Sequence, residues 1–202
     1  ICAMLAVAAF AVLLVMRDRP SDLGLRPFGD EGSEPLPAPP PNNAPIMVAA
    51  LSTLRDASKS SVFWVLFATF FICGATTNGL IQVHLIPMCL DYGIPQVQAA
   101  SLLAAMGIFD FVGTIASGWL SDRYDIRKLL FWYYGLRGLS LLLLPFSDFS
   151  FYGLSLFAVF YGLDWVATVP PTVRLTAQRF GPERANMVFG WIFAGHQLGA
   201  GV

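Results

Sequence analysis

Two oppositely charged residues, Asp110 and Arg137, each lie deep inside a long apolar stretch of the sequence. Counted along a helix from the charged segment between them, Asp110 is about 15 Å away and Arg137 about 13 Å away. A charge in such a setting is costly, and pairing the two would lower the cost of both. A neutralised Asp110 would also be a natural proton carrier. For Asp110, we weigh proton or substrate coupling equally against a structural ion pair.

The last apolar stretch contains two further polar candidates, His196 and Gln197. His196 could bind a substrate or a proton, and a histidine hydrogen-bonded between helices is an equal alternative. The spacing of Gly195 and Gly199 beside it favours close helix packing. Asp164 could pair with Arg174 or with Arg137.

The first long apolar stretch contains three polar residues, Asn78, Gln82 and His84. Their spacing would place them near one face of a helix, where they could contact a solute.

The composition fits a membrane and excludes several other classes of protein. Of 202 residues, 56% are hydrophobic and only 12% are charged, with a net charge of −1. A soluble domain has about twice this share of charge, which argues against a soluble enzyme or a disordered chain. A nucleic-acid binder would need a basic surface. We therefore expect an integral membrane protein whose partner is the lipid bilayer, with no nucleic acid.

The sequence contains no signature of catalysis or of a bound cofactor. Its three cysteines, Cys2, Cys73 and Cys89, are too few and too scattered for a metal site or a disulfide framework. Motifs of hydrolases, phosphate binding and redox chemistry are absent. We expect no enzyme, no metal and no cofactor, and an ion or substrate gradient as the source of energy.

Six apolar segments approach the length of about 20 residues that a helix needs to cross a bilayer. They cover residues 1–16, 62–88, 97–120, 129–146, 151–169 and 186–202. The first and last are cut short, so we interpret the chain as a fragment. Residues 17–61 contain eight of the 14 prolines and predict a solvated linker. Within it, helical spacing from Ile46 to Lys59 predicts a short interfacial helix.

The basic residues alternate between the connections of these segments. Eleven of the 12 lie in the linker, in the connection near Arg123 and in the connection near Arg174. The positive-inside rule therefore places the linker and both basic loops in the cytoplasm.

The connection from Gly118 to Lys128 resembles a loop motif of the major facilitator superfamily. Gly118, Asp122 and Arg123 match it, whereas Asp125 replaces its glycine and the basic pair arrives one position late. Gly118 would let helices approach closely, and Asp122 could cap the next helix or pair with a basic neighbour. The resemblance implies a cytoplasmic gating latch, the alternative being a solvated hairpin, formed by Gly118, Asp122, Arg123, Arg127 and Lys128.

A second resemblance covers Arg17 to Gly29, which is similar to the start of the loop that joins the two halves of monocarboxylate and oxalate/formate antiporter-like transporters. It implies an all-α polytopic membrane bundle, a partial major facilitator fold. Residues 1–16 would end helix six and 17–61 form the cytoplasmic linker. Residues 62–202 would form helices seven to ten and the start of eleven. The N-terminal six-helix half would be missing.

The same resemblance implies roles for several candidates. Asp110 resembles an acidic residue on helix eight of monocarboxylate transporters, although Gly113 and Thr114 stand where the family has an arginine. Helix seven lines the cavity in this superfamily, which favours Asn78, Gln82 and His84 as substrate contacts. Helix nine usually lies outside the cavity, so the resemblance favours a structural role over ion coupling for Arg137.

Together these observations predict a multi-pass secondary transporter of the plasma (inner) membrane that works by alternating access. The expected substrate is a small organic anion, moved by proton symport or by exchange. The alternatives are a multidrug or lipophilic efflux transporter of the same fold and a non-transporting membrane scaffold or receptor.

Overall fold

The computed structural model describes residues 2–17 and 45–202, so most of the proline-rich segment lies outside the described residues. The chain divides into two compact units, and each is described by itself. In the first, α1 (Cys2–Val15) is an apolar helix without a charged residue, and its side chains are exposed. The helical nature expected for residues 1–16 is therefore confirmed.

The second unit is a bundle of helices, and its described residues contain no strand. Four stretches are long and apolar enough to cross a membrane: Ser61–Asp91, Gln96–Ser121, Ile126–Phe146 and Phe151–Phe180. They correspond to four of the predicted segments. The last predicted segment corresponds to α9 (Pro182–Ala200), and the predicted interfacial helix to α2 (Ile46–Ala57).

Two of the four long stretches are interrupted near their middle. The first consists of α3 (Ser61–Gly74), the π-helix η2 (Ala75–Gln82) and α4 (Val83–Asp91). The fourth consists of α7 (Phe151–Asp164) and α8 (Val169–Phe180), separated by a turn over residues 165–168. Between them in sequence lie α5 (Gln96–Ser121) and α6 (Ile126–Leu143), the latter followed by the 3-10 turn η3 (Leu144–Phe146).

The fourth stretch extends beyond its predicted end at residue 169. Pro170 and Pro171 occupy the first positions of α8, where a missing N–H costs little because no helical partner exists there. The prolines therefore start a helix rather than end one. Gly181, with a φ of +86°, separates α8 from α9 in a conformation that glycine adopts without strain.

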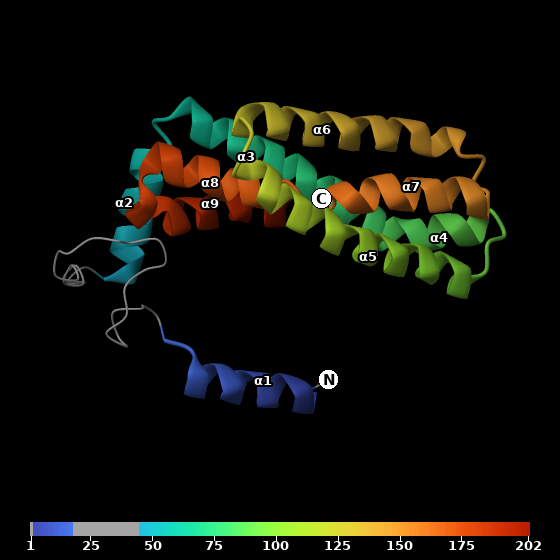
Figure 1. Ribbon diagram of the computed structural model, residues 1–202, viewed down its shortest axis with the longest axis horizontal. Helices are drawn as coiled ribbons and strands as arrows, with labels where there is room; N and C mark the ends of the chain where they lie inside the picture. Colours follow the sequence, from blue (N-terminus) through green and yellow to red (C-terminus); the bar gives the residue numbers. More distant parts are fainter. Residues whose placement is uncertain (1, 18–44) are drawn as a thin grey trace. The chain divides into compact units, whose positions relative to one another are not determined.

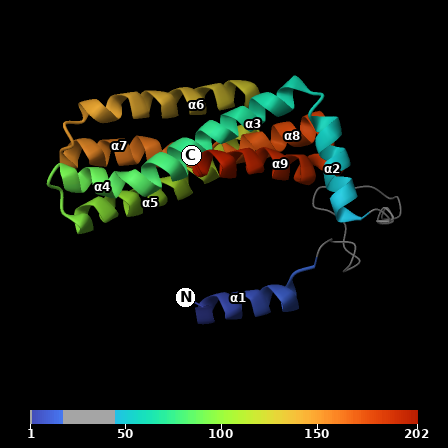
Figure 2. The same cartoon turned by 180° about the vertical axis from the view of Figure 1, so that it is seen from behind.

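The helices of the second unit run side by side, with α6 along one edge of the bundle (Figures 1 and 2). α3 packs along α9, and α5 packs along α7. Buried apolar residues form one cluster around Leu85, Met106 and Tyr161 and a second around Phe70 and Ile192.

Many large apolar side chains face outward from this bundle. Phe111 is 69% exposed, Tyr152 83% and Val97 82%. Such a surface is expected of helices that face lipid. The sequence expectation of an all-α membrane bundle is confirmed.

Candidate functional site

The turn over residues 165–168 leaves backbone groups of the fourth span without helical partners. Pro170 and Pro171 have no N–H, so the carbonyls of Val166 and Ala167 lose the donors that a continuous helix would provide. The N–H of Val169 donates to the Val166 carbonyl instead (2.9 Å), and the Ser117 hydroxyl of α5 donates to the Ala167 carbonyl. The neighbouring helix α5 thus supplies part of the hydrogen bonding that the fourth span loses at this break.

Arg137 of α6 supplies most of the remaining donors at this break. Its Nε donates to Asp164 Oδ2 at 2.7 Å, and its Nη2 donates to the carbonyls of Asp164 and Trp165, the latter at 2.8 Å. Both charged residues are buried, at 2% and 5% exposure. The expected pairing of Arg137 with Asp110 is therefore wrong, and the alternative pairing with Asp164 is the one observed.

The guanidinium also contacts the first span. Its Nη1 lies 2.6 Å from Cys73 Sγ, and the rings of Tyr134 and Tyr161 each have their centroids 5.9 Å from its central carbon. The Tyr161 hydroxyl is 3.4 Å from Thr77 Oγ1 in η2. One buried polar layer therefore connects the first, third and fourth spans.

Asp110 of α5 contacts the same turn over residues 165–168. Its Oδ1 accepts a hydrogen bond from the Val166 N–H (2.9 Å) and another from the Thr114 hydroxyl (3.2 Å). The carboxylate is half-buried. It borders a cavity of about 300 Å³ whose other lining residues are Gln82, Leu103, Gly107 and Trp165. Asp110 is the ionisable side chain of this lining.

The cavity is placed by the two interrupted helices. Gln82 ends the π-helix η2, and Trp165 begins the turn between α7 and α8. π-helical turns and broken membrane helices occur frequently at functional sites, because they free backbone groups and reorient side chains. The geometry therefore makes this cavity the candidate site.

The structure brings together only some of the predicted residues. Gln82 shares the cavity with Asp110, whereas Asn78 is half-buried and His84 is exposed, both away from its lining. The wider i→i+5 turns of a π-helix change the angular spacing, so regular helical spacing does not apply here.

His196 and Gln197 also lie away from the cavity. The half-buried His196 stacks on Phe193 with ring centroids 5.2 Å apart, and Gln197 is exposed. The Nδ1 atom of His196 is buried without a hydrogen-bond partner among the described residues. Close packing at Gly195 and Gly199 is confirmed, because a Cβ on either would overlap the α3 backbone.

The loop that resembles the superfamily motif forms specific contacts. Asp122 pairs with Arg174, which also donates to the Ser121 carbonyl at 2.6 Å. Asp125 caps α6 by accepting the N–H groups of Arg127 (2.9 Å) and Lys128 (3.1 Å). Of the two roles considered for Asp122, pairing is therefore observed, and Asp125 performs the capping.

One other expectation for this loop concerns Gly118. Among the described residues, Gly118 has open space where a Cβ would project and makes no close helix contact. Gly113 does make one, because its Cβ would overlap the Leu163 carbonyl. The guanidinium of Arg123 lies 4.1 Å from the Trp119 ring centroid.

Sequence reasoning missed Trp165, Ser117 and Cys73 as parts of this region. The available signal was Pro170-Pro171, because consecutive prolines free the carbonyls four residues earlier and so call for outside donors.

Comparison with known proteins gives a consistent set of matches. Residues 1–202 match the family profile described as Major Facilitator Superfamily. The chain is 28% identical over 148 residues to YcxA, an uncharacterized MFS-type transporter of Bacillus subtilis (strain 168), covering 69% of this chain and 35% of that protein. No solved structure matches the chain.

Two vertebrate relatives are monocarboxylate transporters by name. Monocarboxylate transporter 12-B of Danio rerio is 32% identical over 143 residues, covering 67% of this chain and 29% of the relative. Monocarboxylate transporter 13 of Rattus norvegicus is 36% identical over 112 residues, covering 54% and 26%. The chain thus spans 26–35% of these relatives. All are transporters by name, in agreement with the expectation that the protein is not an enzyme.

Proposed function

Because the chain belongs to the Major Facilitator Superfamily, we propose that it carries most of one half of a secondary active transporter that moves a small organic anion by alternating access. The proposed mechanism is symport with a proton, and exchange of one anion for another is the alternative. The observation that carries the proposal is the Asp110 carboxylate on the cavity wall, held by an N–H group that a helix break has freed.

The electrostatics of the cavity favour proton symport over exchange. An anionic substrate and an ionised Asp110 in a partly dehydrated cavity would repel each other. Protonation of Asp110 removes that repulsion, so binding of an anion and binding of a proton support each other. Arg137 does not provide the compensating charge, because Asp164 and two carbonyls already occupy its donors.

The substrate class rests on the relatives. Two of them are named for monocarboxylate transport, and a cavity of about 300 Å³ on this half suits a small solute. Lactate and pyruvate are therefore the first probes. Gln82 and Trp165, which border the cavity with Asp110, are the proposed contacts.

The proposed gate lies at the basic end of the bundle. The Asp122–Arg174 pair connects the end of α5 to α8 and is partly exposed, the Asp122 side chain at 70% and the Arg174 side chain at 39%. An exposed ion pair contributes little stability, about 0–1 kcal/mol, so it can form and break at low cost during a transport cycle. An ion pair of this kind suits a gate that opens and closes better than a permanent structural contact. Arg123, Arg127 and Lys128 follow Asp122 in the same connection and belong to the proposed gate.

The remaining organisation follows the superfamily pattern. We assign residues 1–16 to the end of helix six, 17–61 to a cytoplasmic linker and 62–202 to the C-terminal bundle. The protein would reside in the plasma (inner) membrane, with the linker and basic loops in the cytoplasm. A six-helix N-terminal half would complete the cavity.

The test is uptake of radiolabelled lactate and pyruvate by the full-length protein in liposomes under an imposed proton gradient. Accumulation that collapses on adding a protonophore supports the proposal. Flux of a lipophilic cation without flux of either monocarboxylate would instead identify an efflux transporter. No flux of either probe class, with correctly inserted protein, would favour a scaffold.

A further inference from the structure

α2 has one face packed on the bundle and a second, separate apolar stripe that no other described part of the bundle covers. The packed face includes Ala57, which is 2% exposed, and the Ala50 carbonyl, which accepts a hydrogen bond from Trp191 Nε1 of α9 at 3.0 Å. The uncovered stripe consists of Met47, Val48 and Leu51, which are 70%, 57% and 52% exposed. Helical geometry places Arg55 at the C-terminal end of this stripe.

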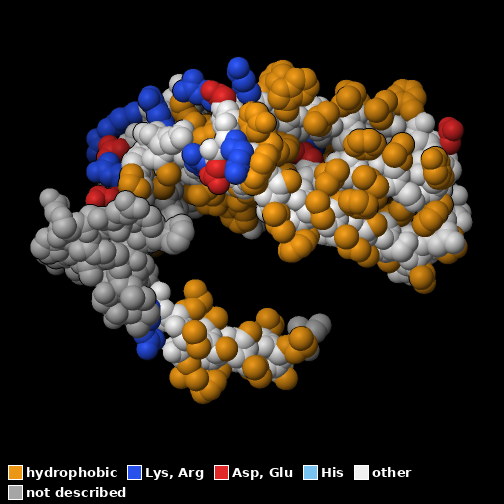
Figure 3. Space-filling view, viewed as in Figure 1, with side chains coloured by type: hydrophobic (Ala, Val, Ile, Leu, Met, Phe, Trp, Pro, Cys, Tyr) orange, Lys and Arg blue, Asp and Glu red, His pale blue; other side chains and the backbone are white. Residues whose placement is uncertain are grey.

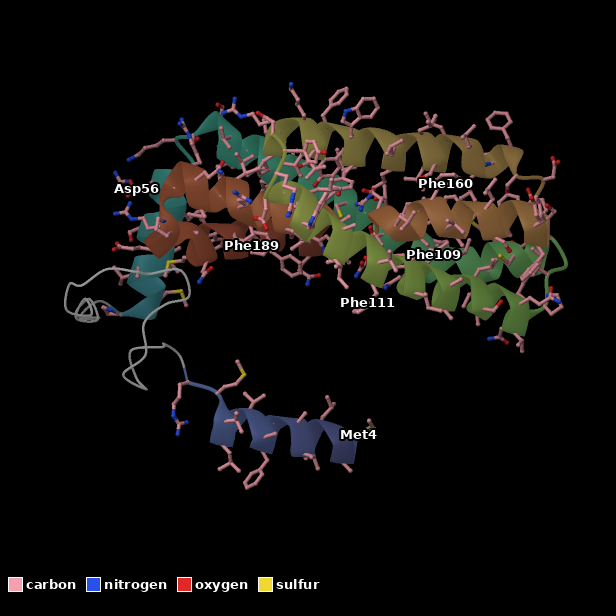
Figure 4. The ribbon with its side chains drawn as sticks, viewed as in Figure 1. Met4, Asp56, Phe109, Phe111, Phe160 and Phe189 are labelled. Carbon is pink, nitrogen blue, oxygen red and sulfur yellow. The ribbon has the colours of Figure 1, made fainter. Side chains whose placement is uncertain are left out.

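The attachment of α2 at the end of the bundle is built from several contacts. Asp56, labelled in Figure 4, hydrogen-bonds Lys59 at 3.0 Å and lies 3.7 Å from Arg184 of α9. The hydrogen bond and the charge of Lys59 lower the pKa of Asp56, so this carboxylate is ionised at neutral pH. These contacts hold α2 on the bundle, so the uncovered stripe keeps a fixed orientation relative to the bundle.

The orientation of α2 differs from that of the spanning helices. It runs across the end of the bundle and not along α3, α6 and α9 (Figures 1 and 2). α3 and α6 belong to stretches that are long and apolar enough to cross a membrane. Spanning helices follow the membrane normal with an average tilt of about 20°, so a helix that runs across their end would follow the plane of the membrane. Lys and Arg side chains gather at this same end (Figure 3).

The level of α2 along the membrane normal is marked by Trp64. This residue lies in the first turn of α3 and is 53% exposed, and its Nε1 donates to the Ser58 carbonyl at 2.8 Å. Exposed tryptophans at the ends of membrane helices lie at the boundary between headgroups and hydrocarbon. Ser58 directly follows α2, so α2 lies beside this boundary.

From these observations we infer that α2 is a membrane-surface anchor that inserts Met47, Val48 and Leu51 into the interface of a leaflet containing anionic phospholipid. The apolar stripe buries against acyl chains, and Arg55 extends to the phosphate layer in the manner of an interfacial amphipathic helix. The surrounding basic residues complement anionic headgroups. The anchor would fix α9, which α2 contacts through Arg184 near the start of that helix and through Trp191 at its middle.

The experiment compares two neighbouring positions of α2 in the full-length protein. Leu51→Cys and Ser52→Cys are made with the three native cysteines replaced by serine, and each is labelled with an environment-sensitive fluorophore. The two side chains are about 100° apart around the helix, and the exposed Ser52 is a matched control at the polar border of the stripe, one turn after Val48. Labelled proteins are placed in phosphatidylcholine vesicles with or without phosphatidylglycerol and containing nitroxide-labelled lipid.

The inference requires the Leu51 probe to be quenched several-fold more strongly than the Ser52 probe, with stronger quenching when phosphatidylglycerol is present. Equal quenching at both positions would overturn it. A Leu51 probe shielded from lipid and cross-linking to another part of the protein would also overturn it, and would identify the stripe as an internal contact.

Discussion

The guanidinium of Arg137 takes over hydrogen bonds that the fourth span loses at its break. Three of its contacts are to oxygens of Asp164 and Trp165, and one is to the sulfur of Cys73. A planar group with five fixed donors suits this task in a way that a lysine ammonium does not. At the scale of single residues, the hydrogen bonding of the turn over residues 165–168 depends mainly on side-chain donors of α5 and α6.

Replacing Arg137 by leucine should destabilise the protein by about 3–5 kcal/mol, because Asp164 would remain as an unpaired buried charge. The double variant Arg137→Leu with Asp164→Leu should recover much of that loss, since both charges are then gone. Thermal unfolding of the full-length protein in detergent measures both effects. An Arg137→Leu variant as stable as the natural protein would contradict the role described for this pair.

Ser117→Ala should cost about 1–3 kcal/mol, because the Ala167 carbonyl would lose its donor in a buried setting. Ser101→Ala in the same helix is the matched control. The Ser101 hydroxyl is exposed and bonds only to the Gln98 carbonyl at 2.7 Å, so its removal should leave stability nearly unchanged. Chemical unfolding of the two variants side by side gives the comparison, and equal losses would argue against the break needing Ser117.

At the scale of elements, α3 and α9 approach closely because glycines replace side chains along their contact. A Cβ on Gly74 would overlap the His196 carbonyl, and one on Gly199 would overlap the Phe71 carbonyl. Small residues of this kind are a common basis of helix association in membranes. The contact holds α9 against the interrupted first span, whose π-helix carries Gln82 to the cavity.

Gly199→Ala should destabilise the bundle by about 1–3 kcal/mol through overpacking against backbone that cannot move easily. Gly190→Ala, in the same helix, meets open space and should be neutral or stabilising by up to about 1 kcal/mol. The unfolding temperatures of both variants test this difference in stability. Equal unfolding temperatures for Gly199→Ala and Gly190→Ala would contradict the role of Gly199 in close packing.

At the scale of the whole molecule, the sequence predicted the helices well and their contacts less well. Segment length and hydropathy were enough for the spans, and the family resemblance is confirmed by the matching profile over residues 1–202. The pairing of Asp110 with Arg137 was wrong, because depth along a helix does not tell which face a residue occupies. The pairing of Asp164 with Arg137, which the sequence offered as one of two alternatives for Asp164, is the one observed.

The cavity was harder to predict than the helices because it depends on two interruptions. Nothing in the residues from Ala75 to Gln82 marks a π-helix in advance, and it changes which polar residues of the first span face the cavity. Gly118 illustrates a related limit: the matching motif position has open space around it, whereas Gly113 packs tightly.

The central claim is that a protonatable Asp110 at the helix break couples proton and substrate movement. Asp110→Asn keeps an oxygen that can accept from the Val166 N–H but cannot carry a proton at neutral pH, so insertion and folding should be unaffected. Proton-driven uptake of lactate by the full-length variant in liposomes is the most direct measurement. The account predicts that this accumulation is abolished. Accumulation at the natural rate, still dependent on the proton gradient, would contradict it.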